Sequence, residues 1–252
     1  MTPGRNQLTK SDSRVDSQTS NYNGRVNAVL REWENALRVR SIADRDEELQ
    51  SRCAGKRVLH LGCTDSPFTL HKLQEHSLLH LKLETVAQSI VGVDIDGVSL
   101  DAMRPVTTRK SQLVLADLQE PGLADVLKAH EFDVVVCADV IEHLDSPGRM
   151  LSNIAALLAP QTQVVITTIN AYAAKLFVRG LMNREAVHPD HVSYYSFATL
   201  KHLTGRFGIK LEEQYLTFRY PLKNRFLSNF QAPLYKLFPA IGDGLFVTGY
   251  RA

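Results

Sequence analysis

The chain has 252 residues, of which 44% are hydrophobic and 22% are charged, enough to bury one sizeable α/β core. A formal net charge of +2 argues against a broad nucleic-acid-binding surface, and three cysteines without CxxC spacing argue against a disulfide framework or a cysteine-based zinc site. The polar N-terminus has no apolar signal segment, and no run of 18 apolar residues occurs. We therefore expect a cytoplasmic protein without a membrane span.

The N-terminal part of the chain divides into two regions of different composition. Residues 1–22 are rich in Ser, Thr, Asn and Gln, so we expect a disordered tail. Apolar residues recur at helical spacing over residues 25–51, which predicts one or two amphipathic helices. No internal repeat and no long Gly/Ser linker follows, so residues 23–252 are predicted to form a single domain.

From residue 58 onward, apolar strand-like runs alternate with helical stretches. The predicted strands are 58–61, 90–93, 112–116, 132–137, 164–168, 209–220 and 245–250. The predicted helices are 69–88, 99–103, 123–129, 147–158, 171–180 and 197–207. Near-continuous apolar strands that alternate with helices are typical of a parallel sheet with helices on both faces. The pattern predicts an α/β fold.

The segment near 220–244, between the last two predicted strands, is rich in aromatic residues, Leu and Lys. An insertion at this point in an open α/β sheet lies near the carboxyl ends of strands. We therefore expect a lid over the binding crevice. The alternative interpretation is a core-packing or oligomer-forming segment, which leaves a homodimer open.

The first predicted strand runs into a loop of small and polar residues. Gly62, Cys63 and Thr64 let a ligand approach the backbone, and Asp65 adds a carboxylate. One glycine and an acidic residue are unfavourable for a di- or triphosphate. The loop suits a ligand that carries an ammonium and a sulfonium group. A tight structural turn is the alternative.

Carboxylates also end the second and third predicted strands. Asp94 can accept hydrogen bonds from two ribose hydroxyls. Asp117 can accept from an adenine amino group, beside the backbone of Leu118. The fourth strand continues as CADVIEHL, residues 137–144, at the carboxyl end of a central strand, where such sheets bind ligands. Together these segments predict a nucleoside-binding pocket.

These four segments, in this order and spacing, resemble the class I S-adenosylmethionine-dependent methyltransferases, and most closely the bacterial small-molecule methyltransferases. The resemblance covers about residues 55–170 and extends through HPDHVSYYS, residues 188–196. It implies a Rossmann-like sheet of seven strands with a reversed last strand, helices on both faces, and S-adenosyl-L-methionine as cofactor.

The resemblance also implies which residues contact the cofactor. They are His60, Gly62, Cys63, Thr64, Asp65, Asp94, Ile95, Asp117, Leu118, Ala138 and Asp139. Asp94 and Asp117 would hold the ribose and the adenine, and the first loop with Ala138 and Asp139 would line the methionine part. This chain departs from the family pattern because it keeps one of three loop glycines and has His60 in place of an acidic residue. Asp65 is our candidate for the missing carboxylate.

Methyl transfer from a sulfonium needs alignment and exclusion of water, and a hydroxyl acceptor can also need a base. Histidine suits that task near pH 7. The candidates are His191, His188 and His143, with a structural role as the alternative for each. We expect no metal site, because no third ligand for the pair at 188 and 191 is apparent in the sequence.

The leading functional prediction is methylation of a small-molecule acceptor, in the simplest case O-methylation in a biosynthetic pathway. Methylation of RNA or protein is the second reading, although the near-neutral charge makes a nucleic-acid partner a poor match. A third reading is a methyltransferase-like scaffold that binds a partner without catalysis, which the glycine-poor loop favours. A dehydrogenase is the weakest option, because a pyrophosphate would need the missing glycines.

Overall fold

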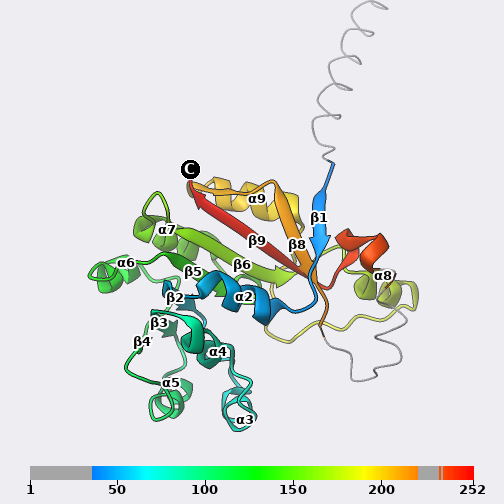
Figure 1. The fold of residues 1–252 in the computed structure, drawn as a ribbon. Coiled ribbons are helices and arrows are strands. Elements are labelled where there is room, and N and C mark those ends of the chain that lie inside the picture. Colours follow the sequence, from blue (N-terminus) through cyan, green and yellow to red (C-terminus); the bar gives the residue numbers. More distant parts are fainter. Residues whose placement is uncertain (1–35, 221–232, 234) are drawn as a thin grey trace, which may run out of the picture. The chain divides into compact units, whose positions relative to one another are not determined.

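The computed structural model describes residues 36–220, 233 and 235–252 (Figure 1). The chain separates into two units, residues 1–37 and 38–252, and the second carries all the elements described below. The predicted tail at 1–22, the part of the predicted helix before residue 36 and most of the predicted lid lie outside the described residues. None of the described helices is long and apolar enough to cross a membrane.

The centre of the second unit is a nine-stranded sheet with strand order β1-β8-β9-β6-β5-β2-β3-β4, and β7 pairs with β9. The strands are β1 (Arg38–Ser41), β2 (Arg57–Leu61), β3 (Ser89–Asp94), β4 (Ser111–Leu115), β5 (Val134–Ala138), β6 (Gln163–Ile169), β7 (Ile209–Leu211), β8 (Gln214–Phe218) and β9 (Gly244–Arg251). Strands β2 to β6 pair in parallel, and β9 runs antiparallel to β6, β7 and β8. The predicted reversal of the last strand is confirmed.

The sheet has nine strands instead of the predicted seven, for two local reasons. Residues 38–41, predicted as helix, form β1, which pairs in parallel with β8 at the sheet edge. The helix begins only at Arg45, because the Asp44 carboxylate accepts hydrogen bonds from the backbone N–H groups of Asp46 and Glu47. The predicted sixth strand also divides into β7 and β8, and only β8 reaches β1.

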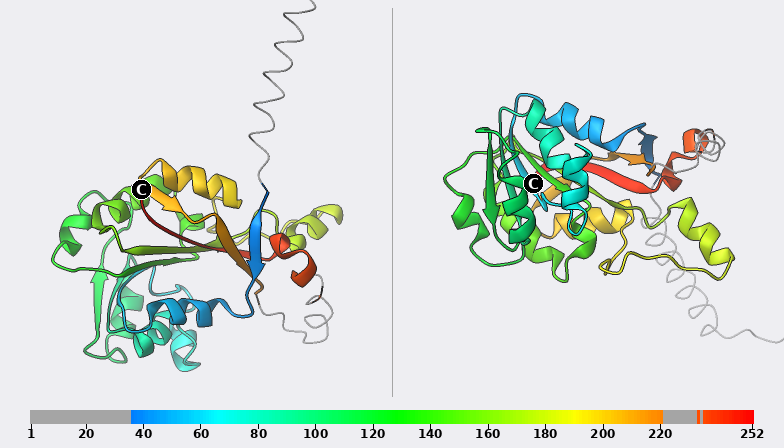
Figure 2. Two further views of the ribbon diagram at one scale, coloured as in Figure 1. Left: turned by 45° about the horizontal axis from the view of Figure 1, so that its top comes forward. Right: turned by 90° about the horizontal axis from the view of Figure 1, so that it is seen from below.

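Helices cover both faces of the sheet, as predicted (Figure 2). The helices are α2 (Arg45–Cys53), α3 (Thr69–Gln74), α4 (Leu79–Val86), α5 (Gly97–Met103), α6 (Leu123–Leu127), α7 (Pro147–Leu157), α8 (Ala174–Leu181) and α9 (Phe197–Gly205), with short 3-10 turns η1 (Ile141–His143) and η2 (Pro239–Ile241). Alternate residues of β2 point to opposite faces. Val58 joins the core of α2 and α4, whereas Leu59 and Leu61 join that of α6, α7 and α9.

The long helix predicted over residues 69–88 is two helices, α3 and α4. The break falls at His76, whose φ of 52° lies in the left-handed region and cannot continue a helix. After the break, α4 lies against the sheet and places His80 in the protein interior. The enlarged first crossover therefore supplies a buried histidine that a single straight helix would not.

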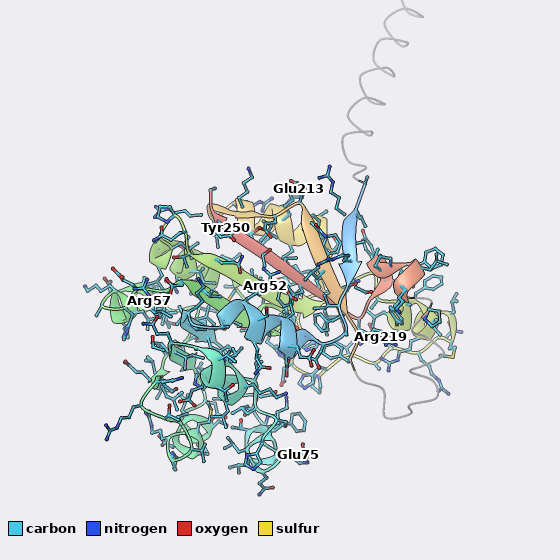
Figure 3. All side chains as sticks on the ribbon, in the orientation of Figure 1. Arg52, Arg57, Glu75, Glu213, Arg219 and Tyr250 are labelled. Carbon is cyan, nitrogen blue, oxygen red and sulfur yellow. The ribbon has the colours of Figure 1, made fainter. Side chains whose placement is uncertain are left out.

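The amino and carboxyl ends of the parallel strands have different surroundings. Arg57 lies at the amino end of β2 (Figure 3). Its guanidinium donates to Asp133 at 2.8 Å and to Glu131 at 2.5 Å. At the carboxyl ends, β2 lies between β3 and β5, so the connections that follow these strands leave in opposite directions along the sheet. Open α/β sheets bind their ligands in the crevice at such a switch point.

Candidate active site

A cavity of about 790 Å³ lies at the carboxyl ends of β2, β3 and β5. Every residue predicted from the sequence to contact cofactor or acceptor lines it. These residues are His60, Gly62, Cys63, Thr64, Asp65, Asp94, Ile95, Asp117, Leu118, Ala138, Asp139, His143, His188 and His191. The volume falls within the range of small-molecule sites. The predicted cofactor and acceptor residues thus share one pocket.

Gly62 is the first loop residue after β2, and both its backbone conformation and the side chain next to it exclude a larger residue. Its φ is 67°, and its N–H donates to the carbonyl oxygen of Val93 at 2.9 Å. A Cβ at this position would lie 2.2 Å from Cγ2 of Val140, in the loop after β5. The glycine therefore lets the loops after β2 and β5 pack together at the cavity floor.

Asp94 at the end of β3 is fixed by backbone donors. Its two carboxylate oxygens accept from the N–H of Thr64 at 2.9 Å and the N–H of Asp96 at 3.0 Å. The residue is only 8% exposed. Each oxygen has further acceptor capacity, so a ligand hydroxyl can meet a carboxylate whose orientation is already set.

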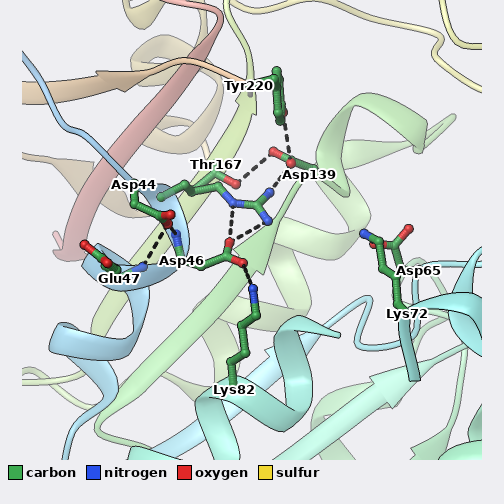
Figure 4. A network of polar contacts seen from close by, with 10 residues as sticks. Asp44, Asp46, Glu47, Asp65, Lys72, Lys82, Asp139, Thr167 and Tyr220 are labelled. Carbon is green, nitrogen blue, oxygen red and sulfur yellow. Dashed lines mark hydrogen bonds and ion pairs between the residues drawn. The ribbon is translucent and has the colours of Figure 1, made fainter. Parts of the chain in front are cut away.

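Asp65, the candidate for the missing carboxylate of the first loop, is paired with Lys72 of α3 (Figure 4). Its φ of 98° turns the chain toward α3. Asp117 is also engaged locally, since one of its oxygens accepts from the N–H of Gln119 at 2.8 Å. A ligand ammonium would compete with Lys72 for Asp65.

His60, which replaces the family's acidic residue, is 1% exposed and belongs to a buried pair. Its ring stacks on that of His80, with centroids 5.4 Å apart and 9° between the planes, and the two Nδ1 atoms are 3.2 Å apart. His80 Nε2 lies 2.8 Å from the Ser111 hydroxyl. Burial lowers the pKa of His60 well below its ordinary value and that of His80 to about 4, so both rings are neutral at pH 7.

The His60–His80 pair has one free end. His60 Nε2 is buried and has no hydrogen-bond partner among the described residues, and the residue lines the cavity. Space for the second ring comes from Gly92 of β3, where a Cβ would lie 2.6 Å from the His80 ring. The chain therefore buries one unsatisfied imidazole nitrogen in a residue that lines the cavity.

Asp139, after β5, is the centre of an ionic network (Figure 4). One carboxylate oxygen accepts from the Arg45 guanidinium and from the Tyr220 hydroxyl, the latter at 3.0 Å. The other oxygen accepts from the Thr167 hydroxyl at 2.9 Å. Arg45 also donates to Asp46, which binds Lys82 of α4 at 2.8 Å. The network ties α2, α4 and the end of β8 to the cavity wall.

Burial and the Asp139 charge shift the acid–base behaviour of the neighbouring groups. Burial alone would lower the pKa of Arg45, but the carboxylates of Asp139 and Asp46 outweigh it and raise that pKa. Burial and Asp139 raise the pKa of Tyr220 well above its ordinary value. Burial, followed by the Asp139 charge, raises the pKa of Glu142 to about 8, and its Oε1 has no partner among the described residues. Glu142 is therefore mainly protonated at pH 7.

The three candidate bases form one cluster. Ligand-type atoms of His143, His188 and His191 all lie within 4.8 Å of one another. Their ring centroids are 4.5 Å (143–191), 4.9 Å (188–191) and 5.6 Å (143–188) apart. The cluster forms because the backbone N–H of Val192 donates to the Glu142 carbonyl oxygen at 2.9 Å. His143 is thus the third imidazole beside His188 and His191 that was not apparent in the sequence.

Several cavity residues were not singled out from the sequence. Arg45 and Tyr220 reach Asp139 from positions 94 and 81 residues away in the chain, so no local pattern marks them. His80 gives a faint signal, since a polar ring among helical leucines opposite a strand glycine can indicate a buried pair. Asp190 also lines the cavity, beside the histidine cluster.

Comparison with known proteins gives the family. Residues 33–214 match a family model described as methyltransferase domain. A ubiquinone biosynthesis O-methyltransferase of Thiobacillus denitrificans is 25% identical over 188 residues, which cover 71% of this chain and 73% of that protein. The protein of the same name from Coxiella burnetii is 24% identical over 193 residues, covering 71% of this chain and 74% of that protein.

Solved structures share the fold at low sequence identity. Magnesium protoporphyrin IX methyltransferase (ChlM) from Synechocystis PCC 6803 with bound SAH is 15% identical with a TM-score of 0.51, covering 100% of this chain and 90% of that one. The [4+2]-cyclase SpnF is 14% identical with a TM-score of 0.51, covering 82% of this chain and 80% of that one. With the family match and the cavity at the switch point, these findings establish that the chain belongs to the methyltransferase domain family and is an S-adenosylmethionine-dependent methyltransferase.

Proposed function

We propose that the chain transfers a methyl group to an oxygen of a small metabolite in a biosynthetic pathway. The observation that carries the proposal is one cavity lined by a fixed carboxylate, by one ring of the buried His60–His80 pair and by the histidine cluster. The O-methyltransferase names of the relatives support the choice of oxygen as the acceptor atom.

Asp94 and Asp117 are the proposed contacts of the cofactor's nucleoside. S-adenosylmethionine, when bound, supplies a methyl group made electrophilic by the sulfonium sulfur. The Asp94 carboxylate, held by the N–H groups of Thr64 and Asp96, would accept from the ribose hydroxyls with little reorganisation. Ile95 and Leu118 would line the same end of the cavity, and Asp117 would accept from the adenine amino group.

His60 is the proposed partner of the cofactor's ammonium group. If Ser111 accepts from His80 Nε2–H, then His80 Nδ1 accepts from His60 Nδ1–H, and His60 Nε2 keeps a free lone pair that the ligand ammonium would meet. A neutral acceptor then replaces the carboxylate found in the family pattern. Gly62, Cys63, Thr64 and Asp65 with Ala138 and Asp139 would surround the rest of the methionine part.

The histidine cluster is the proposed acceptor side of the cavity. Burial, then the neighbouring imidazoles, lower the pKa values of His143 and His191, so neutral rings face the acceptor at pH 7. A neutral imidazole can take a proton from an acceptor hydroxyl, and His191 is the first candidate. Replacement of His191 by Ala would then lower turnover without weakening cofactor binding.

Calorimetry tests the cofactor assignment. Wild-type protein is expected to bind S-adenosylmethionine with micromolar affinity, and Asp94→Ala is expected to weaken binding by about 10- to 100-fold, since hydrogen bonds to a charged group contribute about 1.5–3 kcal/mol each. Asp101→Ala, which removes an exposed carboxylate on α5, is the matched control and should leave the affinity unchanged.

Acceptor screening separates the remaining functions. Labelled methyl groups are expected to appear in a fraction of small metabolites and not in total RNA or protein. Cofactor binding without methylation of any fraction would favour the non-catalytic scaffold, and label in RNA or protein would favour the second reading. An activity assay is essential, because the shared fold also occurs in a protein named as a cyclase.

A further inference from the structure

Three imidazoles meet at the acceptor side of the cavity, from two parts of the chain. His143 ends the turn η1 after β5, and His188 and His191 lie in the loop between α8 and α9. All three line the cavity. Their facing nitrogens lie within 4.8 Å, whereas three nitrogens bound to one tetrahedral zinc ion at about 2.0–2.1 Å lie about 3.4 Å apart. A movement of about 1–1.5 Å, roughly the difference between these two spacings, would bring them to coordination distance.

We propose that His143, His188 and His191 bind one divalent transition-metal ion of the zinc type, with an open coordination position that faces the cavity. Three protein ligands with a fourth position left open are the pattern of catalytic zinc sites. The binding of the ion stands on the cluster alone. Its use, to hold an oxygen of the acceptor in the open position and ease the loss of its proton, rests on the proposed methyl transfer and would replace the role of His191 as a base, because a coordinated nitrogen has no free lone pair.

One ring nitrogen of the cluster is available to bind a cation. His191 Nδ1 is buried and has no hydrogen-bond partner among the described residues, a state that a bound ion would relieve. A metal ligand must be an unprotonated nitrogen without another partner, and His191 Nδ1 is the candidate that the cluster offers.

Asp190 lies beside the cluster, where metal-binding histidines commonly have a supporting partner. Such a ring commonly donates its second N–H to a backbone carbonyl or a carboxylate. The backbone N–H of Asp190 donates to Nδ1 of His188 at 3.3 Å, and the Asp190 carboxylate lies 3.8 Å from the same nitrogen.

The ligand set selects the metal. Imidazole nitrogens favour zinc, cobalt, nickel and copper, whereas magnesium and calcium favour oxygen ligands. The cluster therefore does not favour magnesium. Co²⁺ is the suitable probe, because four-coordinate Co²⁺ absorbs visible light and reports its own geometry.

The test uses full-length protein without a polyhistidine tag, stripped with chelator and titrated with Co²⁺. We expect one Co²⁺ per chain, a visible absorption typical of four-coordinate cobalt, and displacement by Zn²⁺. His188→Ala and His191→Ala should each weaken binding by at least about 100-fold, since even loss of a supporting hydrogen bond weakens metal sites 10- to 100-fold. His202→Ala, an exposed histidine of α9, should leave binding unchanged.

Two results would overturn the proposal: no Co²⁺ bound by the wild type at about 100 μM, a free energy of only about 5.5 kcal/mol, or equal binding by wild type and His188→Ala. His188 lies in an exposed loop, so its replacement should not unfold the protein. S-adenosylmethionine binding, measured on the same metal-free samples, shows that the variants are folded. Intact cofactor binding without metal binding would reject the metal site and leave the proposed methyl transfer standing.

Discussion

Gly62→Ala gives the sharpest test of how the cavity floor is built. The new methyl group would lie 2.2 Å from Cγ2 of Val140, far inside contact distance, at a residue whose φ is 67°. The left-handed backbone costs an alanine about 1–2 kcal/mol. Relief of the overlap costs about 1–3 kcal/mol more. The free energy of unfolding should fall by about 2–5 kcal/mol.

A double-mutant cycle separates these two costs. Val140→Ala removes the methyl groups that the new Cβ would meet, but it leaves the backbone strain in place. Urea denaturation of wild type, Gly62→Ala, Val140→Ala and the double variant should therefore give a coupling energy of about 1–3 kcal/mol. Additive effects, with no coupling beyond about 0.5 kcal/mol, would show that Val140 does not require the glycine.

Two further predictions concern buried titratable groups. The pKa of Glu142 is raised to about 8 by burial and the Asp139 charge, whereas an unfolded glutamate titrates near 4.5, so stability should fall as pH rises between about 5 and 8. Denaturation at several pH values should show a flatter profile for Glu142→Gln, and an unchanged slope would contradict the assignment. His80→Phe keeps the stack on His60 but removes its hydrogen-bond partner, and calorimetry should show S-adenosylmethionine bound about tenfold more weakly. His71→Phe, exposed on α3, is the control, and equal affinities would contradict the His60 role.

The sequence predicts those parts of the molecule that depend on local patterns. The strands from β2 to β6 are short apolar runs with turn residues at their ends, so their type and order follow from periodicity. Asp94 and Asp117 follow strand ends, and the carboxyl ends of parallel strands meet at one edge. The shared cavity of the predicted residues follows from that rule.

The features that the sequence does not predict depend on contacts between residues far apart in the chain. β1 is a four-residue edge strand whose hydrogen bonds go to β8, near the other end of the chain, so its own residues give no strand pattern. The pairing of Arg45 with Asp139 joins residues 94 positions apart. His143 joins the two loop histidines because Val192 is hydrogen-bonded to Glu142, which no spacing in the sequence indicates.

The ionic network around Asp139 has a consequence for how the site tells ligands apart. Two cationic side chains, Arg45 and Lys82, neutralise the anionic pair Asp46 and Asp139. This part of the wall is electrically balanced before anything enters, so a general attraction for a positively charged donor over its uncharged demethylated product must come from other carboxylates of the cavity, such as Asp94 and Asp117. Affinity for the charged donor would then fall as ionic strength rises, whereas affinity for the product would vary little.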